Sequence, residues 1–340
     1  VSLNSKYTGE ASILAILMMI FGVAILLMNQ ISVKSRKSYT TVTGKSGQIS
    51  KFNLGRSGKY IIAIILIIIT FFTSIFPIVS FAFETFLPNP GDYSFLYTGD
   101  PDNLTTKWWV TNENITENGM YGQQGILYND MIWHAYKGTI MVSVCCALTA
   151  GTIGTLIGYA VSKNRRSRWA NYVNSMAFLP YLMPSIAVGV AFFILFSNKY
   201  VNLFNTYALL IIVGTVKYIP FASRSSLNSM LQLSGEIEEA AIIQDIPWTK
   251  RMTRIIIPIQ KTSIISGYLL PFMTCLRELS LFILLCVQGF ILSTTLDYFD
   301  EMGLYAFSSG INLILIVTIL ICNALVNKAT GASLDKGIGG

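Results

Sequence analysis

Charged residues are scarce in this sequence, and their scarcity excludes an ordinary soluble domain. Aspartate, glutamate, lysine and arginine make up 12% of the 340 residues, whereas soluble domains average about 25%. Hydrophobic residues make up 53%, and several apolar runs reach the roughly 20 residues that a helix needs to cross a bilayer. Because lipid cannot satisfy backbone amides, such runs must be helical. The composition therefore predicts an all-α integral membrane protein.

Residues that bind metals or form disulfides are also few. The sequence has one histidine, His134, and its five cysteines all lie within apolar runs. Their spacing fits neither a zinc site nor a disulfide framework. The adjacent Cys145 and Cys146 are better explained as small buried hydrophobic side chains than as a redox pair. We expect no metal and no bound cofactor in this chain.

Seven apolar runs are expected to be membrane spans. They are Ala11–Asn29, Tyr60–Phe83, Met131–Val161, Ala170–Ser197, Tyr207–Ala222, Ser263–Val287 and Phe307–Asn327. Residues 34–59 between the first two spans hold seven lysines and arginines and no acid, whereas residues 84–130 hold seven acids and one lysine. Since lysine and arginine collect on the cytoplasmic side, we expect the N-terminus outside and the C-terminus in the cytoplasm.

Two features of the sequence suggest nucleotide or nucleic-acid binding, but neither supports it on closer inspection. Thr41–Gly47 contains the Gly-Lys-Ser end of a phosphate-binding loop, but Tyr39 occupies the position where the full pattern requires its first glycine. The net charge of +7 comes largely from the cytoplasmic links, where bases set the topology and meet anionic lipid headgroups. We therefore expect this chain to bind neither nucleotide nor nucleic acid.

One long polar segment interrupts the apolar sequence on the expected cytoplasmic side. It reads "SGEIEEAAIIQDIPWTKRMTRIIIPI" and covers residues 234–259. Ser234 can cap a first helix, Asp245 marks a break, and Pro247 can begin a second helix. An amphipathic helix on the inner leaflet and a helix that docks a protein partner both fit this pattern. The three glutamates near the start of the segment weaken the first interpretation, because the inner leaflet is itself negative.

The spacing within this segment resembles the cytoplasmic loop of binding-protein-dependent ABC transporter permeases. The signature of that loop is Glu-Ala-Ala, three residues, Gly, nine residues, then Ile-x-Leu-Pro. The residues at matching positions here are Glu239, Ala240, Ala241, Ile255 and Pro258. Asp245 replaces the glycine, and aspartate tolerates left-handed backbone better than most residues.

The resemblance extends to the ferric-iron subgroup of these permeases. Phe178–Phe192 is similar to their proline-containing span, Cys275–Leu285 to the Arg-Glu segment of the subgroup, and Tyr39–Arg56 to the linker between two fused halves. The resemblance is strongest from Met131 to Lys328. It implies that the first span corresponds to the last helix of a preceding half, and that a six-span type I permease module follows it.

This resemblance implies a division of the chain and a location in a bacterial or archaeal plasma (inner) membrane. The parts are a first span with an external N-terminus (1–33), a basic cytoplasmic linker (34–59), a second span with an acidic outer loop (60–130), a core permease domain (131–328) that contains the coupling loop (234–258), and a cytoplasmic tail (329–340).

The resemblance also implies transport without covalent chemistry. In this family the Glu239 helix would enter a cleft of a cytoplasmic ATPase subunit, with Ala240 and Ala241 allowing close approach. ATP-driven closure of the ATPase dimer would tilt the spans, so ATP and magnesium would bind to the partner. The other implied partners are a second permease half, an extracytoplasmic solute-binding protein and membrane lipid. The subgroup implies ferric iron as substrate, while phosphate, thiamine and polyamines stay open.

Ionisable residues are expected inside the sixth span. Arg277 and Glu278 lie there, and such groups usually face a cavity or one another. A structural role with polar groups on neighbouring helices and a role in the translocation pathway both stay open. Pro184 and Pro271 are candidates for kinks that line the pathway, because a proline frees a backbone carbonyl.

Two other classes of protein stay open at this point. A channel or secondary transporter driven by an ion gradient would show several acids within its spans, whereas Glu278 stands nearly alone here. An assembly subunit that does not transport would use the polar segment only to recruit a partner.

Overall fold

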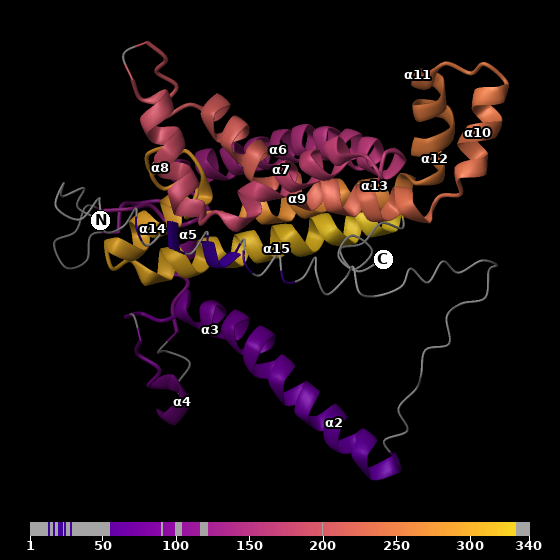
Figure 1. The fold of residues 1–340 in the computed structure, drawn as a ribbon. Helices are drawn as coiled ribbons and strands as arrows, with labels where there is room; N and C mark the ends of the chain where they lie inside the picture. The colour runs from indigo at the N-terminus through magenta and orange to yellow at the C-terminus, as the bar shows by residue number, and fades with distance from the viewer. Residues whose placement is uncertain are drawn as a thin grey trace.

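The computed structural model of the chain is built of helices joined by links of very different length (Figure 1). It describes residues 55–330 except 90, 99–103, 116–121 and 199, together with isolated positions between 13 and 28. Within that part of the chain, β-pairing is confined to two isolated bridges. The all-α fold expected from the composition is confirmed.

The helices differ widely in length, and two short ones, η1 and η3, are π-helical turns. In chain order the elements are α2 (Gly55–Thr70), η1 (Phe71–Ile75), α3 (Phe76–Glu84), α4 (Phe95–Thr98), α5 (Lys107–Val110), α6 (Asp130–Lys163), α7 (Arg168–Leu182), α8 (Ser185–Phe196), α9 (Tyr207–Gln232), α10 (Gly235–Ile243), α11 (Trp248–Arg251), η3 (Met252–Ile256), α12 (Ile257–Ile259), α13 (Lys261–Leu276), α14 (Leu292–Glu301) and α15 (Tyr305–Thr330). Helices α6, α7, α9, α13 and α15 lie side by side in one bundle, with α10–α12 at one end and α5, α8 and α14 at the other (Figure 1).

Four stretches of helix are long and apolar enough to cross a membrane alone. They are Gly58–Glu84, Asp130–Lys163, Tyr207–Gln232 and Tyr305–Lys328. Two bent pairs can each make one further span: α7 with α8, bent by 99°, and Trp248–Ile259 with α13, bent by 85°. These six stretches overlap the six spans expected from Tyr60 onward. The first expected span, Ala11–Asn29, lies mostly outside the described residues, so a total of seven stays a prediction.

Helices α6 and α9 approach one another more closely than large side chains would allow. A Cβ added to Gly154 would lie 2.5 Å from the Cβ of Ala222 and 2.7 Å from the backbone nitrogen of Ser223. One turn further along α6, a Cβ added to Gly158 would lie 2.7 Å from the backbone nitrogen of Leu227. Helices in lipid gain little from hydrophobic association, so small residues that permit close contact hold them together. These two glycines therefore set the spacing of α6 and α9.

The bend between α7 and α8 falls at Met183 and Pro184. Pro184 precedes α8 with a ψ of 136°, and it has no N–H to continue the hydrogen bonds of α7. Carbonyl groups at the end of α7 are thus released. The ammonium group of Lys217, which is buried in α9, donates hydrogen bonds to the carbonyls of Pro180 (3.1 Å) and Met183 (2.6 Å). The bend supplies the partners that a buried cation needs.

The sixth expected span, Ser263–Val287, is shorter in the structure. Helix α13 ends at Leu276, and residues 277–291 form a series of turns. Leu281 and Phe282 in this stretch are fully buried in the core that α6, α8 and α9 share. Irregular backbone is tolerated at membrane depth where protein surrounds it. The hydrophobic run predicted a helix wrongly, because a buried turn segment and a spanning helix have the same apolar composition.

The part of the acidic loop that contains α5 packs on the end of the bundle opposite to α10–α12, whereas α4 lies away from the bundle (Figure 1). The Trp108 indole donates a hydrogen bond to the carbonyl of Leu87 at 2.7 Å and lies edge-on to the Phe307 ring of α15. Ile126 and Phe299 complete the same buried cluster. A long connection therefore becomes part of the folded structure at this end.

Replacing Gly154 by valine should destabilise the bundle, because the new side chain would collide with the backbone of α9. Overpacking of a tight core costs about 1–3 kcal/mol, so the melting temperature of the detergent-solubilised protein should fall by several degrees. As a control, a Cβ added to Gly235 would meet only the flexible Glu239 carboxylate at 3.7 Å, and Gly235→Ala should leave the melting temperature unchanged. Equal melting of all three proteins would show that the glycine is dispensable.

Candidate functional site

The polar segment forms a helical hairpin that projects from one end of the bundle (Figure 1). Its first arm is α10 and its second arm runs from α11 through η3 to α12, ending in the 85° bend before α13. The two short helices expected from the sequence are present. We call residues 234–259 the projecting hairpin.

Asp245 lies at the break between the two arms and has left-handed backbone, with a φ of 52°. Its N–H donates to the carbonyl of Ile242 at 2.9 Å, and the N–H of Ile246 donates to the carbonyl of Ala241 at 3.1 Å. This pair of bonds closes a helix whose next residue is left-handed, a position that glycine usually takes. Aspartate keeps that backbone conformation here. The geometry of the turn is therefore the one that a glycine would give.

The two faces of α10 have different surroundings. Glu238 and Ala241 are buried, whereas Glu239 and Ala240 are exposed. Ile243, at the end of the helix, has 83% of its surface exposed. The exposed face thus combines a carboxylate, a small residue and an uncovered apolar side chain, which is a composition suited to a protein partner.

Glu238 is the charged residue that the sequence analysis did not single out. Its side chain is only 6% exposed and forms an ion pair with Lys163 at the end of α6. The Tyr159 hydroxyl, also from α6, donates a hydrogen bond to Glu238 Oε1. Arg251 Nε of the second arm lies 3.8 Å from the same oxygen. One carboxylate therefore connects α10 to α6 and to α11.

The protonation equilibrium of Glu238 reflects these neighbours. Burial by itself would raise the pKa of the carboxyl group, but the hydrogen bonds from Lys163 and Tyr159, together with the charges of Lys163 and Arg251, outweigh burial and lower the pKa below its ordinary value. The stabilisation from the charged form is present above the ordinary carboxyl pKa and is lost only as the pH falls through the lowered value. The carboxylate is thus charged at any physiological pH.

The second arm contains a π turn where an α-helix would otherwise continue. In η3 the N–H of Ile257 bonds to the carbonyl of Met252, and Pro258 follows directly. A proline clashes with the carbonyl four residues before it, and a wider turn relieves that clash. Ile255 is half-buried and Pro258 is exposed, while Met252 and Ile256 pack with residues of α9 and α13. This apolar side holds the second arm to the bundle.

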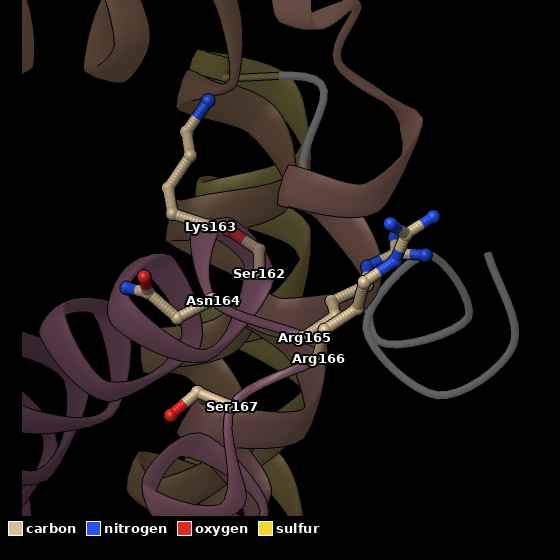
Figure 2. A pocket seen from close by; sticks show the side chains of 6 residues that line it. All are labelled: Ser162, Lys163, Asn164, Arg165, Arg166 and Ser167. Carbon is tan, nitrogen blue, oxygen red and sulfur yellow. The ribbon is translucent and has the colours of Figure 1, made fainter.

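A basic turn joins α6 to α7 beside the projecting hairpin. Residues 162–167 line a shallow surface cavity of about 410 Å³. Lys163 points away from Arg165 and Arg166, whose guanidinium groups lie together (Figure 2). Lys163 thus forms an ion pair with Glu238, whereas the two arginines face another part of the surface.

The two ionisable candidates for the translocation pathway, Arg277 and Glu278, have different surroundings. Arg277 caps the end of α13 and is exposed, while Glu278 is half-buried. The Glu278 carboxylate accepts hydrogen bonds from the Tyr218 hydroxyl (3.0 Å) and from the N–H of Leu281 (3.1 Å). The two residues therefore lie at a helix end and not inside a continuous span, and Glu278 organises the turns that follow.

The two proline candidates differ in their effect on the backbone. Pro184 lies at the bend between α7 and α8, whereas Pro271 is buried within α13, which continues through it. The bend next to α13 falls instead between Ile259 and Lys261.

No group of three or more histidine, cysteine or acidic side chains that could hold a metal ion occurs among the described residues. All five cysteines are free thiols. His134 uses Nδ1 for a 2.9 Å contact with the carbonyl of Gly289, which ties the first turns of α6 to the turn segment. The side chains described for this site are ones that can bind and position.

The bundle, the bent spans and the projecting hairpin are those of a multi-pass helical membrane protein. The chain belongs to the family of binding-protein-dependent transport system inner membrane components, whose profile matches residues 150–332. The resemblance to ABC transporter permeases is thereby confirmed, and the family is one of transport permeases and not of enzymes.

Individual relatives agree with this assignment. The chain is 24% identical over 278 residues to a putative ferric transport system permease protein, FbpB 1, of Haemophilus influenzae, which covers 81% of this chain and 40% of the relative. It is 26% identical over 204 residues to the putrescine transport system permease protein PotI of Escherichia coli K12, covering 57% of this chain and 68% of the relative. The chain thus spans less than half the length of the Haemophilus protein.

A solved structure has the same fold. A bacterial alginate ABC transporter, in complex with an alginate pentasaccharide-bound periplasmic protein, contains a chain that matches with a TM-score of 0.57 at 15% identity, covering 81% of this chain and 96% of that chain.

The left-handed backbone at Asp245 can be tested by substitution. Glycine adopts this conformation freely, so Asp245→Gly should preserve the turn, whereas Asp245→Val should disfavour it by about 1–2 kcal/mol. Hydrogen–deuterium exchange of the amides of Ile242–Ile246 should rise severalfold in the valine variant and stay at the wild-type level in the glycine variant. Identical exchange in both variants would contradict the constraint.

Proposed function

We propose that this chain is the permease subunit of an ATP-driven ABC importer, coupled to a cytoplasmic ATPase through the projecting hairpin. The observation that carries the proposal is the position of Glu239 on the exposed face of α10. This helix is the first arm of an element that stands clear of the bundle (Figure 1). Family membership supports the transport role. ATP and magnesium would bind to the ATPase and not to this chain.

Docking would use the exposed face of α10. Glu239 would supply a charge for a basic group in an ATPase cleft, Ala240 would keep this face narrow, and Ile243 would contribute apolar area. Ala241, which the sequence placed beside Ala240 in this contact, lies on the buried face instead. The turn at Asp245 would fix the direction of the first arm, and the stretch from Ile255 to Pro258 would anchor the second arm. Because the hairpin continues into α9 on one side and α13 on the other, its movement would tilt both spans.

Membrane topology is part of the same proposal. The hairpin and the basic turn at residues 162–167 share one end of the bundle, which we assign to the cytoplasm because bases collect there. The folded acidic loop with Trp108 lies at the opposite end and would meet an extracytoplasmic solute-binding protein. A second permease half would complete the pathway, and lipid would surround both halves.

Arg277 and Glu278 receive different roles. Glu278 is engaged by Tyr218 and by a backbone N–H, so we assign it to positioning the turn segment. Arg277 is exposed at the end of α13, so we assign it to the translocation pathway. We propose that the bend at Pro184 also lines this pathway, whereas Pro271 is buried in α13 and supports the helix.

Ferric iron is the substrate that we propose. The ferric relative matches 81% of this chain, whereas the putrescine relative matches 57%. The proposal for iron rests on that difference in coverage and on the Arg-Glu segment.

The coupling role predicts that Glu239→Arg abolishes ATPase association and uptake together. Loss of one partner from a buried charged contact costs about 2–5 kcal/mol, a drop in affinity of roughly 30-fold or more. Two measurements test this prediction: co-purification of the ATPase subunits with the permease in mild detergent, and solute uptake in cells. Glu236→Arg is the matched control, because Glu236 is an exposed acid on the same helix. Unchanged uptake in Glu239→Arg would overturn the coupling role.

The substrate is tested separately by uptake in the host cell. Deleting the gene should reduce accumulation of radioactive ferric iron under iron limitation and leave putrescine accumulation unchanged. The opposite pattern would identify a polyamine permease and leave the coupling role intact.

A further inference from the structure

Helix α10 has little apolar contact to hold it against the bundle. Of its nine residues, Glu238 and Ala241 are the buried ones. Two residues, Leu233 and Ser234, separate it from α9, and its other end leads into the turn at Asp245. A helix attached only by these links would pivot when a partner pushes on it. Its direction therefore depends on the turn at Asp245 and on the contacts of Glu238, the one charged residue that α10 buries.

The partners of Glu238 lie on other helices, α6 and α11. Lys163 and Tyr159 belong to the last turns of α6, which packs along α9 and α13. Arg251 belongs to the second arm and also donates a hydrogen bond from Nη1 to the carbonyl of Ile246 at 2.9 Å. The carboxylate thus connects α10 directly to a span with which the hairpin has no covalent junction.

We propose that Glu238 is a positioning residue that locks α10 to the end of α6, so that a displacement of the hairpin moves α6 together with α9 and α13. This inference rests on the proposed coupling function and adds a direct contact from the hairpin to a third span, α6, which is already packed against α9 and α13. Glu239 on the exposed face makes the contact with the ATPase, and the adjacent Glu238 on the buried face transmits it.

Neighbouring bases do not offer a substitute for Lys163. Arg165 and Arg166 point away from it (Figure 2). Arg251 Nε is buried without a hydrogen-bond partner among the described residues and lies 3.8 Å from the carboxylate, so it adds attraction without a direct bond. Removing the Lys163 charge should therefore loosen α10 even though other bases are near.

The lock is tested first in the permease itself. Glu238→Gln and Lys163→Met should each raise hydrogen–deuterium exchange in α10, and the double variant should exchange no faster than Glu238→Gln, because that variant has already lost the ion pair with Lys163. Lys163→Arg keeps the charge and should restore protection. Glu236→Gln is the control and should match the wild type. Additive effects of the two substitutions, or wild-type exchange in both, would overturn the lock.

The coupling consequence is tested in the assembled transporter, purified from cells that express the full permease. Glu238→Gln should keep the ATPase subunits bound, since Glu239 is intact, while solute transported per ATP hydrolysed falls about fivefold or more, the range of typical coupling free energies. Tyr159→Phe, which removes one hydrogen bond, should give a smaller fall. Loss of ATPase binding, or an unchanged transport ratio, would overturn the inference.

The two proposals fail in distinguishable ways. Absence of ATPase from the wild-type complex would refute the proposed function, whereas a wild-type complex that assembles and a Glu238→Gln complex that couples normally would refute only the lock.

Discussion

The close contact between α6 and α9 is the constraint on which the rest of the structure depends. Gly154 and Gly158 bring the two backbones together, and every element of the site continues from one of these helices. Helix α6 ends in Tyr159 and Lys163, while α9 leads into α10 and carries Lys217 and Tyr218. If the two helices stood further apart, Glu238 could not reach Lys163 and Tyr159 on α6. Packing inside the bundle thus determines the direction of an element outside it.

Where a helix of the bundle is interrupted, a polar side chain forms hydrogen bonds with the backbone carbonyl or N–H groups that have lost their helical partners. Lys217 takes up the carbonyls released at the α7–α8 bend, and Glu278 binds the N–H of Leu281 where α13 stops. Both residues are ionisable, and both are held by backbone groups. In lipid no water can replace these partners, so backbone irregularity and buried charge occur together.

Much of this arrangement was predictable, and the failures have physical causes. Hydrophobic runs predicted six of the helical stretches, and the spacing around Asp245 predicted a two-armed segment with a break. The end of α13 at Leu276 was missed, because apolar composition measures burial and not backbone shape. Glu238 was missed for another reason: three glutamates lie close together in α10, and its partner Lys163 is far away in the sequence. Only the fold shows which carboxylate faces inward.

Because of the π turn η3, the number of residues in the second arm affects its orientation, in addition to the identity of those residues. A π turn holds one more residue than a turn of α-helix, and each extra residue rotates the following side chains by about 100°. The nine residues between Asp245 and Ile255 include the first part of η3, so their number sets which side of the arm faces the bundle. Insertions or deletions in this arm would redirect α13 even where every contacting side chain is kept. The number of residues in the loop is therefore under structural constraint independently of their identity.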